Sequence, residues 1–415
     1  MNHRTVLLVL FLCMGPAGAH AQDIVIPDAP PADTPKAEDW NEFDWGFTTA
    51  RVGFATIHEY ATYKQDQNAR NQMALAGVTL EPQWKFRDFR FFSSGRLNVQ
   101  RPIIWRVAAM RDGVEDTWTF RETGVLIGLP EARGHLFIGR SKEGYSLYKV
   151  QNGYSTWGNE RQMSLDLVPV MTDGIRYYGF APKSRLFWSV GGFTNALYGH
   201  NSKFLLWEWT YSGRFGWRPV MEQDGERVVH LGINYRYARP DQDRIQVRSR
   251  PESNPAPYFV DTGKFQSSRS HSVGWEAYYQ NGPLLLGSEA NWHSFNSIQA
   301  GDPTYFGQDY VLSYILTGEH HPFKSDTSAF HFVVPQKSLF EGGRGAWEAL
   351  VRYSSFNLNK GLLAGGYFWK ITPMVNWYVS PALRLEVVYG YGVLDRFHLE
   401  GATQFFQTRF QIQIM

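Results

Sequence analysis

The sequence is poor in cysteine, in excess charge and in long apolar stretches, and each shortage excludes a class of protein. It holds 41 Lys and Arg against 39 Asp and Glu, so it lacks the cationic excess of a dedicated nucleic-acid binder. Beyond residue 21, no apolar run approaches the roughly 18 residues that a membrane-spanning helix needs. The only cysteine, Cys13, lies near the N-terminus, which excludes a disulfide scaffold in the rest of the chain. Aromatic residues are abundant instead, at 16%, and this content excludes disorder for most of the chain.

Residues 1–21 have the three parts of a secretory signal peptide. Arg4 provides the basic start, residues 6–14 form a short apolar core, and small residues follow in an A-x-A pattern that ends at Ala21. We expect cleavage after Ala21, which removes Cys13 and leaves an exported chain without thiols. An uncleaved anchor helix is the alternative, but the apolar core is too short for it.

The rest of the sequence predicts a short leader followed by an all-β domain. Residues 22–44 are rich in proline and acidic residues and have no periodicity, which indicates a flexible leader. From Trp45 to the end, residues 45–415, short stretches alternate between apolar and polar side chains and are bounded by Gly, Pro, Asn or Asp. In residues 229–237, for example, Val, Leu, Ile and Tyr alternate with His, Gly, Asn and Arg. Each strand therefore has one apolar and one polar face.

This alternation fits both a soluble β-sandwich and a transmembrane β-barrel, and three features favour the barrel. Tyr and Trp recur near strand ends, as in the aromatic girdles of membrane barrels, and the chain finishes on an alternating strand. The connections 239–270 and 318–345 are long whereas 379–381 is tight, which we interpret as long loops on one side and short turns on the other. At about 25 residues per strand and connection, the exported chain predicts an antiparallel barrel of about 16 strands around a water-filled lumen.

Several motifs occur in a fixed order from about residue 50 to the C-terminus. They are IGRSKEGYSLYKV at 138–150, NER at 159–161, VVHLGINYRYA at 228–238, LTGEHHPF at 316–323, GAWEALVRYS at 345–354 and VNWYVSPALRLEVVY at 375–389. As a collinear series they resemble the phosphate-selective porin O and P family of Gram-negative outer membranes. The resemblance implies a sixteen-stranded barrel, a homotrimer, and a third extracellular loop, approximately residues 142–161, that folds inward to narrow the pore.

The same resemblance implies a ladder of arginines and lysines that leads to a narrow anion site. Two positions differ from the family pattern: Arg70-Asn71 stands where an arginine pair is expected, and Gly144 where the inward loop is expected to carry a carboxylate. These departures keep a second interpretation open, a general or organic-solute porin of the same fold.

The alternation also sorts strand charges by face, independently of any family. Nine bases but only four acids, Glu276, Glu289, Glu348 and Glu386, are assigned to the inward face, so we expect a positive lumen with most acids in the leader and loops. A charge pair is worth about 4 kcal/mol at 4 Å but well under about 1 kcal/mol across a wide aqueous pore, so selectivity must arise at a constriction. The predicted pore-lining or anion-binding residues are Lys85, Arg87, Arg140, Lys142, Lys149, Arg176, Arg214, Arg218, Arg236, Arg352, Arg384 and Arg409. Any of these residues could instead form an ion pair in the wall. The facing of Arg96 and Arg106 stays open, because Pro102 breaks the alternation between them.

We expect no enzymatic activity, cofactor or metal site. Glu319-His320-His321 is a poor metal motif because adjacent histidines of an extended chain point to opposite faces, and no phosphate loop, dinucleotide fingerprint or nucleophile elbow occurs. The expected function is an anion-favouring diffusion channel of the outer membrane, with phosphate or polyphosphate as leading solutes. The expected partners are small anions, outer-membrane lipid and lipopolysaccharide, two further copies of the chain and the barrel-assembly machinery, but not nucleic acid. A barrel hydrolase and a secreted glycan-binding β-protein are the remaining alternatives.

Overall fold

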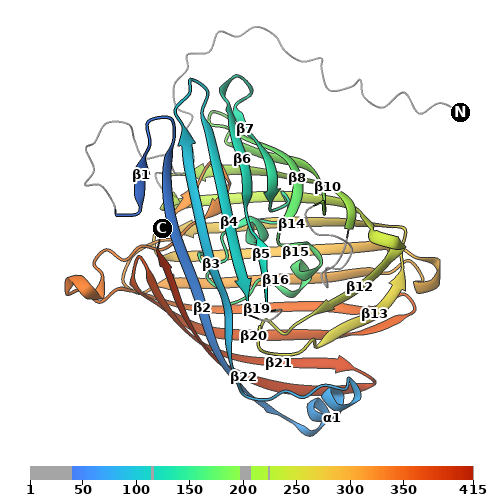
Figure 1. Cartoon of the computed structure of the whole chain (residues 1–415). Coiled ribbons are helices and arrows are strands. Elements are labelled where there is room, and N and C mark those ends of the chain that lie inside the picture. The colour runs from blue at the N-terminus through green and yellow to red at the C-terminus, as the bar shows by residue number, and fades with distance from the viewer. Residues whose placement is uncertain (1–39, 114–115, 197–206, 223–224, 415) are drawn as a thin grey trace, which may run out of the picture.

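All but four strands of the described chain, β12, β13, β17 and β18, belong to one antiparallel sheet, which closes on itself (Figure 1). The computed structural model describes residues 40–113, 116–196, 207–222 and 225–414. The sheet has 18 strands, but β5 and β6 are two pieces of one wall strand because both pair with β4. β1 pairs only with the start of β2, so the wall consists of sixteen strands, as the sequence predicted. In the described part of the chain, no helix combines the length and apolar character needed to cross a membrane.

The wall strands from β4 to β9 are shorter than those from β10 to β22. The first half of the ring comprises β2 (Thr49–Gln65), β3 (Gln83–Leu97), β4 (Ile103–Asp112), β5 (Thr117–Phe120), β6 (Thr123–Leu129), β7 (Gly134–Ser141), β8 (Thr172–Ala181) and β9 (Leu186–Thr194). The second half comprises β10 (Trp207–Met221), β11 (Arg227–Pro240), β14 (Arg269–Asn281), β15 (Leu284–Asn296), β16 (Thr304–Ile315), β19 (Ala346–Lys360), β20 (Leu363–Ser380), β21 (Leu383–Arg396) and β22 (Leu399–Ile414). The connections contain helices α1 (Gln67–Leu75) and α2 (Leu147–Val150) and the short pairs β12 (Arg244–Ser249) with β13 (Val260–Gln266) and β17 (Phe323–Lys324) with β18 (Ala329–Phe330).

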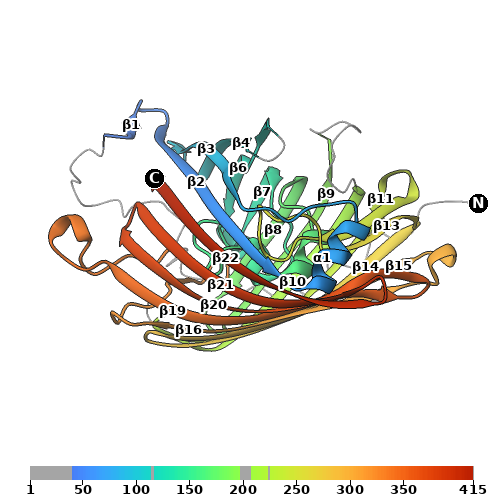
Figure 2. The same cartoon turned by 90° about the horizontal axis from the view of Figure 1, so that it is seen from below.

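The last strand closes the barrel by pairing with the first. β22 runs antiparallel to β2, from Phe54 opposite Ile414 to Gln65 opposite Thr403. Figure 2 shows these two strands side by side. No edge of the wall is therefore left unpaired along this seam, which is how membrane barrels satisfy their backbone hydrogen bonds.

The apolar face of each strand points outward and stays uncovered. On β11, Leu231, Ile233 and Tyr235 are 42%, 64% and 47% exposed, whereas His230 before them and Arg236 after them are buried. A sandwich would bury the apolar face against a second sheet, so the exposure decides for a barrel whose polar faces line the interior. The assignment of faces made from the alternation on this strand is confirmed.

The connections lie alternately at the two ends of the barrel. We call the end where β2 begins and β22 finishes the terminal end, and the opposite end the distal end. Residues 66–82, 142–171 and 241–268 connect strands at the distal end, and residues 316–345 at the terminal end (Figure 1). The prediction that the two long connections share one side is wrong, because three strands, β14, β15 and β16, separate them and an odd number reverses the end.

Ordered structure begins slightly before the predicted domain boundary. β1 (Glu42–Asp44) pairs with residues 49–51, and Asn41 exchanges hydrogen bonds with Val52. Residues that the composition assigned to the flexible leader thus extend the wall at the terminal end. The predicted signal peptide, its cleavage site after Ala21, and residues 22–39 of the leader lie outside the described residues.

Candidate functional site

The 142–171 segment, between β7 and β8, is anchored to the polar face of the far wall. Glu289 of β15 accepts hydrogen bonds from Ser146 Oγ (2.5 Å), from the Tyr148 amide (2.8 Å) and from Gln162 Nε2 (3.0 Å). Two of these donors belong to the first turn of α2 and its N-cap, where a carboxylate also meets the positive end of the helix. One wall carboxylate therefore fixes both ends of the segment's central part.

Wall arginines hold the same segment from another direction. Arg384 of β21 donates to the carbonyl oxygens of Thr156 (2.7 Å) and Trp157 (3.0 Å), and Arg352 of β19 donates to that of Glu160 (2.7 Å). Strands β15, β19 and β21 alternate with β16 and β20 in one continuous stretch of the wall, so the segment is held along that stretch. These guanidinium groups help to hold the backbone of the 142–171 segment in place.

The two lysines expected to bind anions bond to the segment itself. Lys142 Nζ donates to the carbonyl oxygens of Val150 (3.0 Å) and Gln151 (2.6 Å), and Lys149 Nζ to that of Leu165 (2.9 Å). Burial lowers the pKa of the Lys149 ammonium to about 7 and that of Lys142 well below its usual value. The positions of these lysines in the sequence did not indicate that backbone carbonyl groups would be their hydrogen-bond partners.

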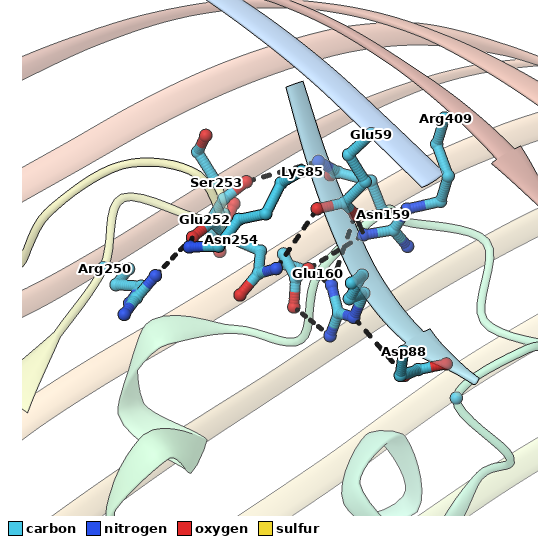
Figure 3. A network of polar contacts seen from close by, with 12 residues as sticks. Glu59, Lys85, Asp88, Asn159, Glu160, Arg250, Glu252, Ser253, Asn254 and Arg409 are labelled. Atoms are coloured by element: carbon cyan, nitrogen blue, oxygen red, sulfur yellow. Dashed lines mark hydrogen bonds and ion pairs between the residues drawn. The ribbon is translucent and has the colours of Figure 1, made fainter. Parts of the chain in front are cut away.

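An ion-pair network joins the segment to the seam of the barrel (Figure 3). Arg409 of β22 donates through Nε to Glu59 Oε1 of β2 (2.6 Å) and through Nη2 to Glu160 Oε1 (2.8 Å). Arg87 of β3 donates to the other oxygen of Glu160 (3.0 Å), and Asn254 Nδ2 donates to Glu59 (3.3 Å). The 241–268 segment, to which Asn254 belongs, thus meets the 142–171 segment at this network.

The connections bring acids to the polar face, contrary to our expectation. Glu143, Glu160 and Glu252 all belong to connections, yet Glu143 pairs with Arg236 (2.5 Å) and Glu252 with Arg352 (2.9 Å). The predicted separation of a cationic wall from acidic loops is therefore wrong, because the acidic connections fold back against that wall. The four acids assigned inward, Glu276, Glu289, Glu348 and Glu386, are all buried there as predicted.

The predicted site residues fall into two sets by their partners. Those paired with carboxylates are Arg87, Arg140, Arg214, Arg236, Arg352, Arg384 and Arg409. Those bonded to backbone carbonyls or hydroxyls are Lys85, Lys142, Lys149, Arg176 and Arg218. The ion-pair alternative therefore describes more than half of the predicted residues.

Exposure separates the cations by their place in the ring. The side chains of Arg87 and Arg106 remain 22% and 27% exposed, whereas those of Arg214 and Arg352 are 0% and 1% exposed. The partly exposed cations of this region include Lys85, Arg87, Arg90, Arg106, Arg121, Arg161 and Arg176, all on β3 to β8, their connections or the 142–171 segment. An ion in water can reach cations along β3 to β8 but not those buried on β10 to β22.

Four basic side chains gather at this part of the wall: Arg90 of β3, Arg121 between β5 and β6 and Arg161 of the 142–171 segment, which are partly exposed, and Lys142 of the same segment, which is buried. We call these the cation cluster. A Cβ atom placed on Gly153 would lie 3.5 Å from Arg161 Nη2 and 3.8 Å from Arg90 Nη1, so the two guanidinium groups border the same small space. Burial, followed by the charges of Arg161 and Arg121, lowers the pKa of Lys142, and burial together with the charges of Arg87 and Arg90 lowers the pKa of Arg161 to about 10.

The cluster has fewer acidic partners than cations. Arg90 pairs with Asp88 (2.6 Å), which also accepts a hydrogen bond from Tyr154 Oη (2.6 Å). Among the described residues, none forms a hydrogen bond or ion pair with the guanidinium of Arg121. Like charges about 4 Å apart repel by about 4 kcal/mol at an effective dielectric constant near 20. An anion held between them would offset this repulsion.

Sequence reasoning did not select Arg90, Arg121 or Arg161 for the site. A β-bulge opposite Ile57 and His58 makes Arg87 and Asp88 both point inward and reverses the alternation before Arg90. Arg121 lies in the break between β5 and β6, where alternation gives no face. The adjacent charges Arg121-Glu122, which stand between two stretches that carry no charge, are the one signal that the sequence offers here.

Comparison with known proteins assigns the chain to a family. Residues 108–414 match the family described as phosphate-selective porin O and P. Porin O of Pseudomonas aeruginosa is 25% identical over 213 residues, which cover 42% of this chain and 47% of that protein. An uncharacterised protein of Caulobacter vibrioides is 27% identical over 195 residues, or 46% of this chain and 38% of the relative. The matches thus span less than half the length of these curated relatives.

Solved structures with the same fold are outer-membrane proteins. The anion-selective porin of Comamonas acidovorans superimposes with a TM-score of 0.54 at 10% identity, over 88% of this chain and all of that one. The outer-membrane channel DcaP of Acinetobacter baumannii gives 0.55 at 6% identity, over 89% of this chain and 99% of the channel. Such low identities establish the fold alone. Since the family match covers most of the barrel from β4 to the last strand, the chain belongs to the phosphate-selective porin O and P family.

Proposed function

We propose that this porin forms a water-filled channel of the Gram-negative outer membrane that favours anions. The observation that carries the proposal is the cation cluster: Arg90, Arg121 and Arg161 are partly exposed, Arg90 and Arg161 border the space beside Gly153, and Asp88 is the carboxylate bonded to Arg90. Guanidinium forks suit phosphate and carboxylate oxygens, and several weak cationic positions allow an anion both to enter and to leave. By family, phosphate and polyphosphate are the leading solutes.

The pathway for water and ions runs along strands β3 to β8. The 142–171 segment acts as the inward-folded third loop that narrows this pathway, and its anchoring by Glu289 and Arg384 supports that role. In this arrangement the distal end, with its long connections, faces the outside of the cell. The cations along the pathway bind solutes, whereas the buried arginines of β10 to β22 hold the wall and the connections together.

In the membrane, lipid and lipopolysaccharide contact the exposed apolar face, and the barrel-assembly machinery inserts it. The functional unit is a homotrimer, in keeping with the trimer form described for OmpT of Vibrio cholerae, which has the same fold. The signal peptide at residues 1–21 directs export.

A general or organic-solute porin is the second candidate. It is favoured by the acids beside the accessible cations, since Asp88 pairs with Arg90 and Glu122 with Arg106. Such pairs weaken the field that an anion meets.

An enzyme of the same fold has one arrangement in its favour. Ser328 Oγ lies 3.3 Å from His230 Nδ1, and His230 Nε2 lies 2.7 Å from Glu276 Oε2, in the order of a hydrolase triad. All three residues are at most 1% exposed, so a substrate cannot reach the serine. The contacts serve to hold the 316–345 segment.

Reversal potentials across a planar bilayer with a salt gradient test the proposal. Replacing Arg90, Arg121 and Arg161 together by glutamine should lower the anion-to-cation permeability ratio, by about tenfold for each 1.4 kcal/mol of lost stabilisation. The control is Arg227→Gln, in an exposed pair with Glu222 at the terminal end, which should leave the ratio unchanged. Equal ratios for the triple variant and the control would refute the role of the cluster. Added phosphate should block chloride current in the native channel, and its failure to do so would favour the general porin.

A further inference from the structure

The 316–345 segment folds against the polar face from the terminal end. The turn between β17 and β18 is fixed by two cations of β10: Arg214 donates to the carbonyl oxygens of Thr327 (3.2 Å) and Ser328 (2.8 Å), and Arg218 to that of Ser325 (2.9 Å). Arg214 is itself held by Glu276 at 2.7 Å. The tip of this hairpin is therefore clamped to the wall.

The base of the hairpin is clamped as well. His321 Nε2 lies 2.9 Å from Glu348 Oε1 of β19, and Gln280 of β14 donates to the His321 carbonyl at 2.7 Å. Phe323 packs on the backbone of Gly225 so closely that a Cβ atom there would lie 2.4 Å from the Phe323 Cβ. Glycine is therefore required in that turn to let the hairpin in.

The 316–345 and 142–171 segments, which start from opposite ends of the barrel, meet inside it, and Trp157 lies at their contact. Trp157 is fully buried, and its ring stacks on Tyr148 with 4.9 Å between centroids. Its other faces and edges meet Phe330 (5.6 Å) and His321 (6.0 Å) of the 316–345 segment and Tyr278 of β14 (5.6 Å). Among the described residues, the Trp157 Nε1 atom has no hydrogen-bond partner, so its ring is held by packing.

This contact links the hairpin to the cation cluster through a short stretch of chain. Trp157 precedes Arg161 by four residues and follows Gly153 by four, and the backbone between them is bonded to Arg384 and Arg352. A displacement of the Trp157 ring would therefore shift the backbone that carries Arg161. It would also change the size of the space beside Gly153.

We propose that the 316–345 segment is a buttress that positions the 142–171 segment, with Phe330 and Trp157 as positioning residues. The inference rests on the proposed channel function and adds an element to it: selectivity depends on a connection that starts at the opposite end of the barrel from the cluster. The hairpin, clamped at tip and base, also keeps the half of the lumen along β10 to β20 filled, and so confines solutes to the β3 to β8 side.

Single-channel recording of Phe330→Ala tests the proposal, with Phe340→Ala as the matched control. Both residues belong to the same segment, but Phe330 is 1% exposed and Phe340 is 75% exposed. Phe330→Ala should raise the conductance by about twofold or more, because a pore conducts according to the cross-section that its lining leaves open. It should also lower the anion-to-cation permeability ratio, whereas Phe340→Ala should behave as the native channel. A Phe330→Ala channel indistinguishable from Phe340→Ala would overturn the proposal.

A double-mutant cycle shows whether Phe330 and Trp157 act through their mutual contact or affect the conductance independently. If Phe330 acts through Trp157, then Trp157→Ala with Phe330→Ala should change the conductance no more than the stronger single variant does. Additive changes would contradict the proposed coupling.

A second variant applies if Phe330→Ala does not assemble. Phe330→Leu, which keeps most of the side-chain volume, should still admit larger sugars than the native channel in a liposome-swelling assay. An unchanged size limit would count against the buttress. If the proposed channel function is wrong, the native protein itself will show no anion preference. The comparison of conductance between Phe330→Ala and Phe340→Ala would still test the buttress in that case.

Discussion

Replacement of Arg352 by methionine should destabilise the barrel strongly, because this arginine joins the wall to two connections. Its side chain is 1% exposed and pairs with Asp309 (2.5 Å) and Glu252 (2.9 Å), and it also donates to the Glu160 carbonyl (2.7 Å). Arg352→Met leaves two buried carboxylates, 3% and 1% exposed, without their shared cation. The loss of one partner of a buried ion pair costs about 3–5 kcal/mol, so we expect the free energy of unfolding to fall by about that amount.

The assay is equilibrium unfolding in urea of the protein refolded into lipid vesicles, followed by tryptophan fluorescence. The control Arg227→Met removes an arginine that is 52% exposed and should cost about 1 kcal/mol or less. Adding Asp309→Asn to Arg352→Met should recover part of the loss, since one unpaired charge is removed. Equal losses for Arg352→Met and Arg227→Met would refute the view that the buried arginines of β10 to β22 serve the scaffold.

Two further predictions concern the outer face and pH. Val387, which is 60% exposed on the apolar face of β21, should tolerate leucine but lose about 2–4 kcal/mol on replacement by arginine if it lies near the bilayer midplane. Refolding yield in vesicles measures this loss, and equal yields of the two variants would contradict the outward assignment. Lys149 has a folded-state pKa of about 7 against an ordinary value of 10.5, so between these values the unfolded chain binds a proton that the folded chain has released. The free energy of unfolding should therefore rise with pH from about 7 to 10.5, and Lys149→Met should reduce this slope. A slope equal to that of the native protein would show that the ammonium is not buried.

The barrel could be predicted from the sequence because each wall strand needs apolar side chains on the face that contacts lipid and polar side chains on the face that contacts water. This requirement gives the apolar and polar side chains a period of two over many residues, as in β11. The pattern can be recognised without knowing any contact between distant residues. The same argument assigned Arg214, Arg236 and Arg384 to the polar face, where the structure has them. It failed at Arg90 because one bulged residue in β3 reverses the alternation.

The partners of the charges could not be predicted from the strands alone. Arg352 pairs with Glu252, and Arg409 with Glu160, across 100 and 249 positions of the sequence respectively. Such pairs depend on how the connections fold back, and alternation carries no signal for that. The end at which the 316–345 segment emerges was nevertheless available from the sequence, since it follows from the number of strands that precede it.

The reversal potential of the purified native protein in a planar bilayer, measured under a potassium chloride gradient, tests the central claim most directly. The account predicts a sign that corresponds to preferred passage of chloride, and a current that falls when phosphate is added. A reversal potential of the opposite sign, or a correctly folded barrel that passes no current, would contradict it.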